Sequence, residues 1–166
     1  MLGVLMAVFY GKASLADPEP PFAFEEKPWV EGQTEIPAFP KSEQLIEFYV
    51  GPTEQNRFYV DGSTISIGND GVVRYVVVIR TSGGASNVNL EAMRCASREV
   101  KLFAVGRSDG TWSKIPAPRW QPIESKLMNH YRSILNRNFL CPAGHTPSDA
   151  SEARAALRQG KHPDAV

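Results

Sequence analysis

The chain has 166 residues, of which 42% are apolar, and its 18 basic and 18 acidic residues leave no formal net charge at neutral pH. The apolar fraction excludes a disordered chain, and the length suits one domain with a core of ordinary size. The balanced charge provides no field that would draw the protein to nucleic acid or to an anionic membrane, so nucleic-acid binding is not expected.

The first residues have features of an export signal. An apolar run over 2–10 precedes Ser14 and Ala16, small residues that suit the pockets of a signal peptidase. No Lys or Arg precedes the run, so we expect residues 1–16 to be a signal peptide truncated at its start. The alternative is a cytosolic domain whose first strand or helix is hydrophobic. No later stretch is apolar enough to span a bilayer, so no transmembrane anchor should remain after cleavage. We expect the exported protein to be periplasmic or peripheral to the outer membrane.

Residues 17–40 are rich in proline and are interrupted by aromatic side chains, among them Trp29 and Phe39. Proline-rich sequence forms extended chain rather than helix, and a plain linker has little use for large apolar groups. We therefore expect an extended arm whose second half lies against the domain. The alternative is that another protein binds the arm.

A β-rich domain is expected over residues 41–142. Turn signals such as 69–71 and 83–84 separate short apolar or alternating runs, which predicts neighbouring antiparallel strands in a meander. Residues 72–80 are apolar on both faces and should form a central strand. The other expected strands cover 45–50, 57–61, 63–67, 88–94 and 99–106.

The register of the hairpin formed by residues 88–94 and 99–106 depends on its loop. A three-residue loop at 96–98 places Ala92 opposite Leu102, apolar against apolar. A two-residue loop places Ala92 opposite Lys101 instead and mixes the two faces. The sequence pattern favours the three-residue loop.

One apolar stripe at helical spacing predicts a helix over 125–138. The stripe consists of Leu127, Tyr131, Ile134, Leu135 and Phe139. The predicted fold class is therefore α+β, an antiparallel meander sheet covered on one face by this C-terminal helix. Residues 143–166 are expected to be a flexible or weakly helical tail, with Asp149 and Glu152 as a capping box and Gly160 as the stop.

Cys95 and Cys141 are the two cysteines of the chain. In a cytosolic protein they would be unrelated thiols, whereas in an oxidising compartment the pair predicts a structural disulfide. The bond would join the end of the strand at 88–94 to the end of the predicted helix. Neither cysteine belongs to a C-x-x-C motif, so redox catalysis has no support.

The sequence contains no recognisable catalytic, metal-binding or phosphate-binding motif, so we predict a non-enzymatic protein without a cofactor. Its expected partner is an envelope protein or another envelope component, bound through the arm or one sheet face. Arg74, Glu91 and Lys101 are expected to meet on the open face of the sheet, as cross-strand ion pairs or as a ligand patch. Trp112 and Trp120, together with Trp29 and Phe39 of the arm, are further candidates for contact with a partner. The alternative is that they pack within the domain.

Short blocks in a fixed order between Trp29 and Cys141 carry a family resemblance. They are Trp29-Val30-Glu31, Ile36-Pro37-Ala38-Phe39-Pro40, Phe58-Tyr59-Val60-Asp61, Ser66-Ile67-Gly68-Asn69-Asp70-Gly71-Val72-Val73-Arg74-Tyr75, Gly84-Ala85-Ser86-Asn87-Val88, Arg94-Cys95 and Trp120-Gln121-Pro122-Ile123. Together they resemble the cryptic-neisserial-protein-like family, small exported bacterial proteins whose function is uncharacterised.

A looser likeness, to the surface-adhesin protein E type of domain, rests on the strand at Tyr59-Val60-Asp61, the long strand after it, and the order of the two cysteines. It implies a sheet packed on a helix with one disulfide, and it suggests binding of extracellular host proteins without supplying a binding residue. A surface adhesin is therefore the first alternative function. A cell-envelope hydrolase is the second, and it would need a deep pocket with convergent titratable groups.

Overall fold

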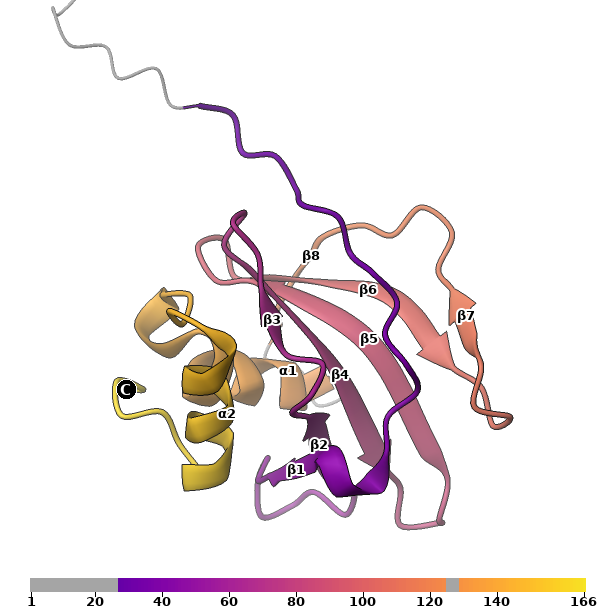
Figure 1. Cartoon of the computed structure of the whole chain (residues 1–166). Coiled ribbons are helices and arrows are strands. Elements are labelled where there is room, and N and C mark those ends of the chain that lie inside the picture. The colour runs from indigo at the N-terminus through magenta and orange to yellow at the C-terminus, as the bar shows by residue number, and fades with distance from the viewer. Residues whose placement is uncertain (1–26, 125–128) are drawn as a thin grey trace, which may run out of the picture.

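The structure is a computed structural model that describes residues 27–124 and 129–166. The predicted signal peptide, the first part of the arm and Leu127 of the helical stripe lie outside the described residues. The body of the domain is an antiparallel sheet with the order β1-β2-β4-β5-β6-β7, in which β3 pairs with β4 and β8 with β6 (Figure 1). The strands are β1 (Leu45–Phe48), β2 (Arg57–Asp61), β3 (Ser66–Ile67), β4 (Val72–Arg80), β5 (Ser86–Arg94), β6 (Glu99–Gly106), β7 (Trp112–Lys114) and β8 (Gln121–Pro122).

Tight turns join successive strands, so the strands lie side by side as an antiparallel meander. The central strand is apolar enough to be buried on both of its faces. β4 is central, as predicted, and its first seven residues are buried between two layers. The turns on either side of it close at Gly71 and Gly84, whose φ angles of 72° and 86° lie in the left-handed region that glycine adopts without steric cost. The predicted antiparallel sheet is therefore confirmed.

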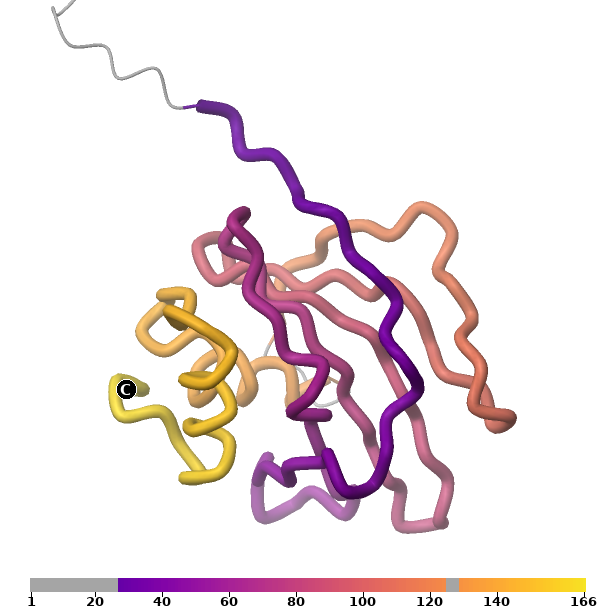
Figure 2. The backbone as a smooth tube through the Cα atoms, viewed as in Figure 1, coloured from indigo at the N-terminus to yellow at the C-terminus, as the bar shows by residue number. Residues whose placement is uncertain are grey.

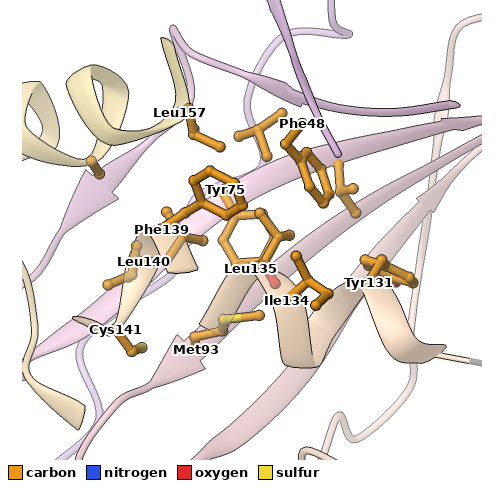
Figure 3. Close-up of a cluster of buried hydrophobic side chains, with 14 of the residues drawn as sticks. Phe48, Tyr75, Met93, Tyr131, Ile134, Leu135, Phe139, Leu140, Cys141 and Leu157 are labelled. Carbon is orange, nitrogen blue, oxygen red and sulfur yellow. The ribbon is translucent and has the colours of Figure 1, made fainter. Parts of the chain in front are cut away.

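The helical part begins with α1 (His130–Leu135) and continues through a wide turn, η3 (Asn136–Leu140), to a short turn at η4 (Pro142–Gly144). The stripe residues that the structure describes are all buried against the sheet (Figure 3). Asn136, which helical spacing places on the polar side, is also buried, because η3 departs from regular α-helical spacing.

Residues 150–159 form the helix that the sequence suggested as an alternative to a flexible tail, and the helix is packed against the domain rather than loose. They form α2 (Ala150–Gln159), in which Asp149 caps the first turn and Gly160, at φ 83°, ends the helix. Ala153, Ala156 and Leu157 are buried in the main core. Small alanine side chains bury little area each, but they let the helix lie close to β1 and η3 so that Leu157 reaches the core.

The register of the β5–β6 hairpin differs from the favoured one. Ala92 lies opposite Lys101, not Leu102, and a β-bulge between Leu90 and Glu91 then shifts the pairing by one residue. The favoured register is therefore wrong next to the loop, where Arg94 pairs with Glu99, and right beyond the bulge, where it places Leu90 opposite Ala104. The physical reason is that Phe103 has no partner on β5, so the two ends of the hairpin follow different registers.

Both faces of the sheet are covered. The helices pack on one face around the main core, and the arm crosses the opposite face (Figures 1 and 2). Beneath the arm lies a second apolar cluster, whose buried members are Tyr59, Val76, Val78, Val88, Leu90 and Ala104. Cys95 and Cys141 form the predicted disulfide, with 5.2 Å between their Cα atoms, and it joins the end of β5 to the end of η3.

Candidate functional site

The arm is held to the sheet by contacts that we call the arm clasp, made by residues 29–39. The indole Nε1 of Trp29 donates to the Asp70 carbonyl at 2.8 Å, and the Gly32 amide donates to the Asp70 carboxylate at 2.7 Å. Arg74 donates to the Gly32 carbonyl and to Thr34 Oγ1, and it pairs with Asp70 at 2.7 Å. Hydrogen bonding by Arg74 lowers the pKa of Asp70 from 3.8 to about 2.

A second part of the arm clasp centres on Glu31. Its carboxylate accepts hydrogen bonds from Lys101 Nζ at 2.8 Å and from the Trp120 indole at 3.2 Å. Trp29 meets Trp120 edge to face, with ring centroids 6.2 Å apart, and the Arg94 guanidinium lies 3.9 Å from the centroid of the Trp29 ring. Both charged and aromatic groups of the sheet are therefore used to hold the arm.

The last part of the arm clasp is apolar. The rings of Phe39 and Trp112 lie 5.4 Å apart, and the Trp112 indole donates to the Pro37 carbonyl at 2.9 Å. Phe39 lies so close to Gly106 that a Cβ atom there would be 2.7 Å from the ring. Only glycine leaves room for the arm at this position.

The structure places the candidate interaction residues in two groups. Six of them belong to the arm clasp, namely Trp29, Phe39, Arg74, Lys101, Trp112 and Trp120. They bind the arm to the sheet within one chain, and the expected packing of the second half of the arm is confirmed.

The expected meeting of Arg74, Glu91 and Lys101 on one face is wrong. Arg74 and Lys101 both lie opposite Ala92, whereas Glu91 is the next residue along β5. Because neighbouring side chains of a strand point to opposite faces, Glu91 points to the helices.

Glu91 is the centre of a buried polar cluster. It is completely buried, and its carboxylate accepts hydrogen bonds from Tyr131 at 2.7 Å, Tyr75 at 3.0 Å and Arg132 Nη2 at 2.6 Å. Burial and the charge of Glu91 raise the pKa of both tyrosines well above their ordinary value. The phenols therefore stay protonated and act as fixed donors to the carboxylate.

Sequence reasoning missed the partners of Glu91. Tyr131 belonged to the apolar stripe, and Arg132 to the polar side of the predicted helix. The available signal was Glu91 itself, a carboxylate between Leu90 and Ala92 in a strand whose other charged residue, Arg94, is at its end. A charge in such a position is rarely buried unless it is paired, so it requires a cation from another element.

A cleft of about 590 Å³ opens beside this buried cluster, and we call it the asparagine cleft. The ends of β4, β5 and β6 and the first residues of α1 contribute to it, together with the loop before β2. Its polar lining comprises Glu54, Asn56, Asn87, Asn89, Asn129, His130 and Arg132, and its apolar lining includes Phe58, Ile79, Val88 and Val105.

Arg132, which lines the asparagine cleft, forms an ion pair with Glu91, so its positive charge is balanced. Burial disfavours the charge of Arg132, but the ion pair with Glu91 outweighs it and raises the pKa of the guanidinium above its ordinary value. Arg132 binds Glu91 through Nε and Nη2, and Nη1 has no hydrogen-bond partner among the described residues. Arg132 thus lines the cleft with its charge balanced by Glu91, and it also lines a second pocket beside Leu102 and Gln121.

Two further findings bear on the kind of site. Among residues 27–124 and 129–166, no group of three or more His, Cys, Asp or Glu side chains is arranged to hold a metal ion. Within the same residues, no helix has the length and apolar character needed to cross a membrane.

The sequence profile of the CNP1-like family matches residues 24–158, which is most of the chain. The chain belongs to the CNP1-like family. The match to the CNP1-like family includes the whole sheet, the arm clasp, both cysteines and the residues of the asparagine cleft, and it confirms the family resemblance predicted from the sequence blocks. No curated protein and no solved structure gives a significant match to this CNP1-like chain, so the likeness to the protein E type of domain stays a prediction.

Proposed function

We propose that this member of the CNP1-like family is a non-enzymatic binding protein of the bacterial cell envelope, and that it holds an envelope component in the asparagine cleft. The observation that carries the proposal is the cleft itself, in which several polar side chains converge over an apolar floor. Its volume falls within the range of about 300–1,000 Å³ that is usual for small-molecule sites.

The arm and the sheet faces were the first candidates for a binding surface, and apart from the strand ends that line the asparagine cleft they are occupied within the chain. The helices cover one face, and the arm clasp uses the aromatic and charged residues of the other. A partner that bound the arm would first have to break the hydrogen bonds of Gly32 with Asp70 and Arg74 and the ion pair of Glu31 with Lys101. This cost favours a ligand that enters the asparagine cleft.

The chemistry around the cleft supports binding rather than catalysis. Glu91 is completely buried and already accepts hydrogen bonds from two phenols and a guanidinium, so it is positioned to hold Arg132 and not to exchange protons with a substrate. The tyrosines that contact it keep their protons because their pKa values are raised.

The cell envelope is supported by the disulfide between Cys95 and Cys141, because such bonds persist in oxidising compartments. The predicted signal peptide agrees with this location. A periplasmic protein would resist protease added to intact cells, whereas a surface adhesin would be digested. Digestion would therefore favour the adhesin over the periplasmic binding protein.

The direct test is in-cell photo-cross-linking of the full-length protein. A photoreactive residue at the exposed position Asn87 should capture one dominant envelope component, while the same group at the exposed position Lys161, outside the cleft, should not. Equal capture from both positions, or no capture from Asn87 above background, would overturn the proposal.

A further inference from the structure

The polar lining of the asparagine cleft consists mainly of side-chain amides. Asn87 and Asn89 are two residues apart on β5 and so face the same side, Asn56 precedes β2, and Asn129 precedes α1. Each amide has both an acceptor and donors, and the Asn89 amide already donates to Glu91 at 3.4 Å. Hydroxyl and amide groups of an uncharged ligand match this lining, since they also donate and accept.

The apolar floor is built by two cross-strand rows on the helix side of the sheet. In one row Phe58 lies opposite Ile79, which lies opposite Asn87; in the other, Asn89 lies opposite Val105. Amides therefore stand next to apolar side chains along both rows. A ligand with polar edges and apolar C–H faces, as in a sugar ring, fits such an alternation better than a purely apolar or purely polar molecule.

The charge of the cleft disfavours an anion. The positive charge of Arg132 is balanced by Glu91 at 2.6 Å, and Glu54 adds a carboxylate to the lining. What Arg132 offers to a ligand is the Nη1 donor, in a fixed direction because Nε and Nη2 are held by Glu91. A neutral carbonyl oxygen, such as that of an acetamido group, is a suitable acceptor.

We infer that the asparagine cleft binds an uncharged N-acetylated sugar oligomer, with ring hydroxyls on the asparagine amides and an acetamido carbonyl on Arg132 Nη1. This inference rests on the proposed function and names its ligand class. The fixed position of Arg132 matters, because a donor that is already oriented loses little entropy when the ligand binds.

The test is an NMR titration of the full chain with tri-N-acetylchitotriose, observing the side-chain amide signals of the cleft asparagines. We expect these signals to shift, and maltotriose, which lacks acetamido groups, to bind at least about tenfold more weakly if one hydrogen bond to Arg132 is lost. Asn87→Ala should weaken binding about 3- to 10-fold, and Asn138→Ala, outside the cleft, should leave it unchanged.

Each contrary result overturns a defined statement. Equal binding of maltotriose overturns the acetamido contact, and stronger shifts with inorganic phosphate or trialanine amide overturn the sugar class. If chitotriose shifts no cleft signal while the cross-linker at Asn87 still captures a component, the ligand class is wrong and the proposed function stands. Failure of both experiments overturns both.

Discussion

Asp70 and Glu91 are two carboxylates that the fold has removed from water, and each is paired with an arginine. Asp70 with Arg74 holds the arm on one face of the sheet, whereas Glu91 with Arg132 holds α1 on the other. Burial of a charge is costly unless it receives several hydrogen bonds, and both carboxylates do. One pair therefore attaches the arm, and the other attaches α1, to opposite faces of the sheet.

Removing the carboxylate of Glu91 should destabilise the protein strongly. Glu91→Ala leaves the largely buried Arg132 and two phenols without their acceptor, and we expect a loss of about 3–5 kcal/mol in the free energy of unfolding. Urea unfolding measures it. The control is Glu47→Ala, which breaks the exposed pair with Arg57 and should cost much less; equal losses would contradict the role given to Glu91.

The stability contributed by Asp70 should depend on pH. Hydrogen bonding by Arg74 lowers its pKa from 3.8 to about 2 in the folded state, so the contribution is fully present above pH 3.8 and is lost as the pH falls through about 2. Asp70→Asn should therefore be less stable than the native chain at pH 7 by at most about 2 kcal/mol, and the difference should vanish near pH 2. A difference that stays constant across urea unfolding curves at several pH values would show that this pKa is not responsible.

At the scale of elements, each face of the sheet is covered by a segment that is distant from it in the sequence. The extended arm lies over the second apolar cluster, and α1, η3 and α2 lie over the main core. The arm has no regular secondary structure, so its position is fixed by the contacts of the arm clasp alone. It is a structural part of the domain and not a free linker.

Close packing of the arm can be tested at Gly106. A Cβ atom there would lie 2.7 Å from the Phe39 ring and 2.8 Å from Val88, so Gly106→Ala should push the arm away and cost about 1–3 kcal/mol of stability. Faster hydrogen exchange at the Gly32 amide, which donates to Asp70, would localise the effect. Gly51→Ala is the matched control, because nothing lies within 4 Å of a Cβ there. Unchanged exchange in Gly106→Ala would mean that the arm tolerates the added methyl group.

For the molecule as a whole, the disulfide links the two layers. It connects the end of β5 to the end of η3 across 46 positions in the sequence. Closing a loop of this length restricts the unfolded chain, so the double variant Cys95→Ser/Cys141→Ser should lose about 4 kcal/mol. Thermal or urea unfolding measures the loss. Labelling of both cysteines by a thiol reagent in the denatured, unreduced protein from cells would show that the bond does not form there.

Local sequence patterns were enough to predict the type of most elements and the places where they turn. The apolar run of β4, the turns at Gly71 and Gly84, the buried stripe of α1, the cap at Asp149 and the cysteine pair were all predictable. Periodicity, turn chemistry and redox context encode such features within a few residues or by residue type.

Contacts between distant side chains depend on how the elements pack and could not be predicted from local patterns. Glu91 and Arg132 are 41 residues apart, and Glu31 and Trp120 are 89 apart, so no local pattern pairs them. The bulge at Phe103 gives the two ends of the β5–β6 hairpin different registers, and the arm covers a sheet face that the sequence left open for a partner. The asparagine cleft exists because strand ends, a loop and the start of α1 come together, and such convergence depends on the packing of all three at once.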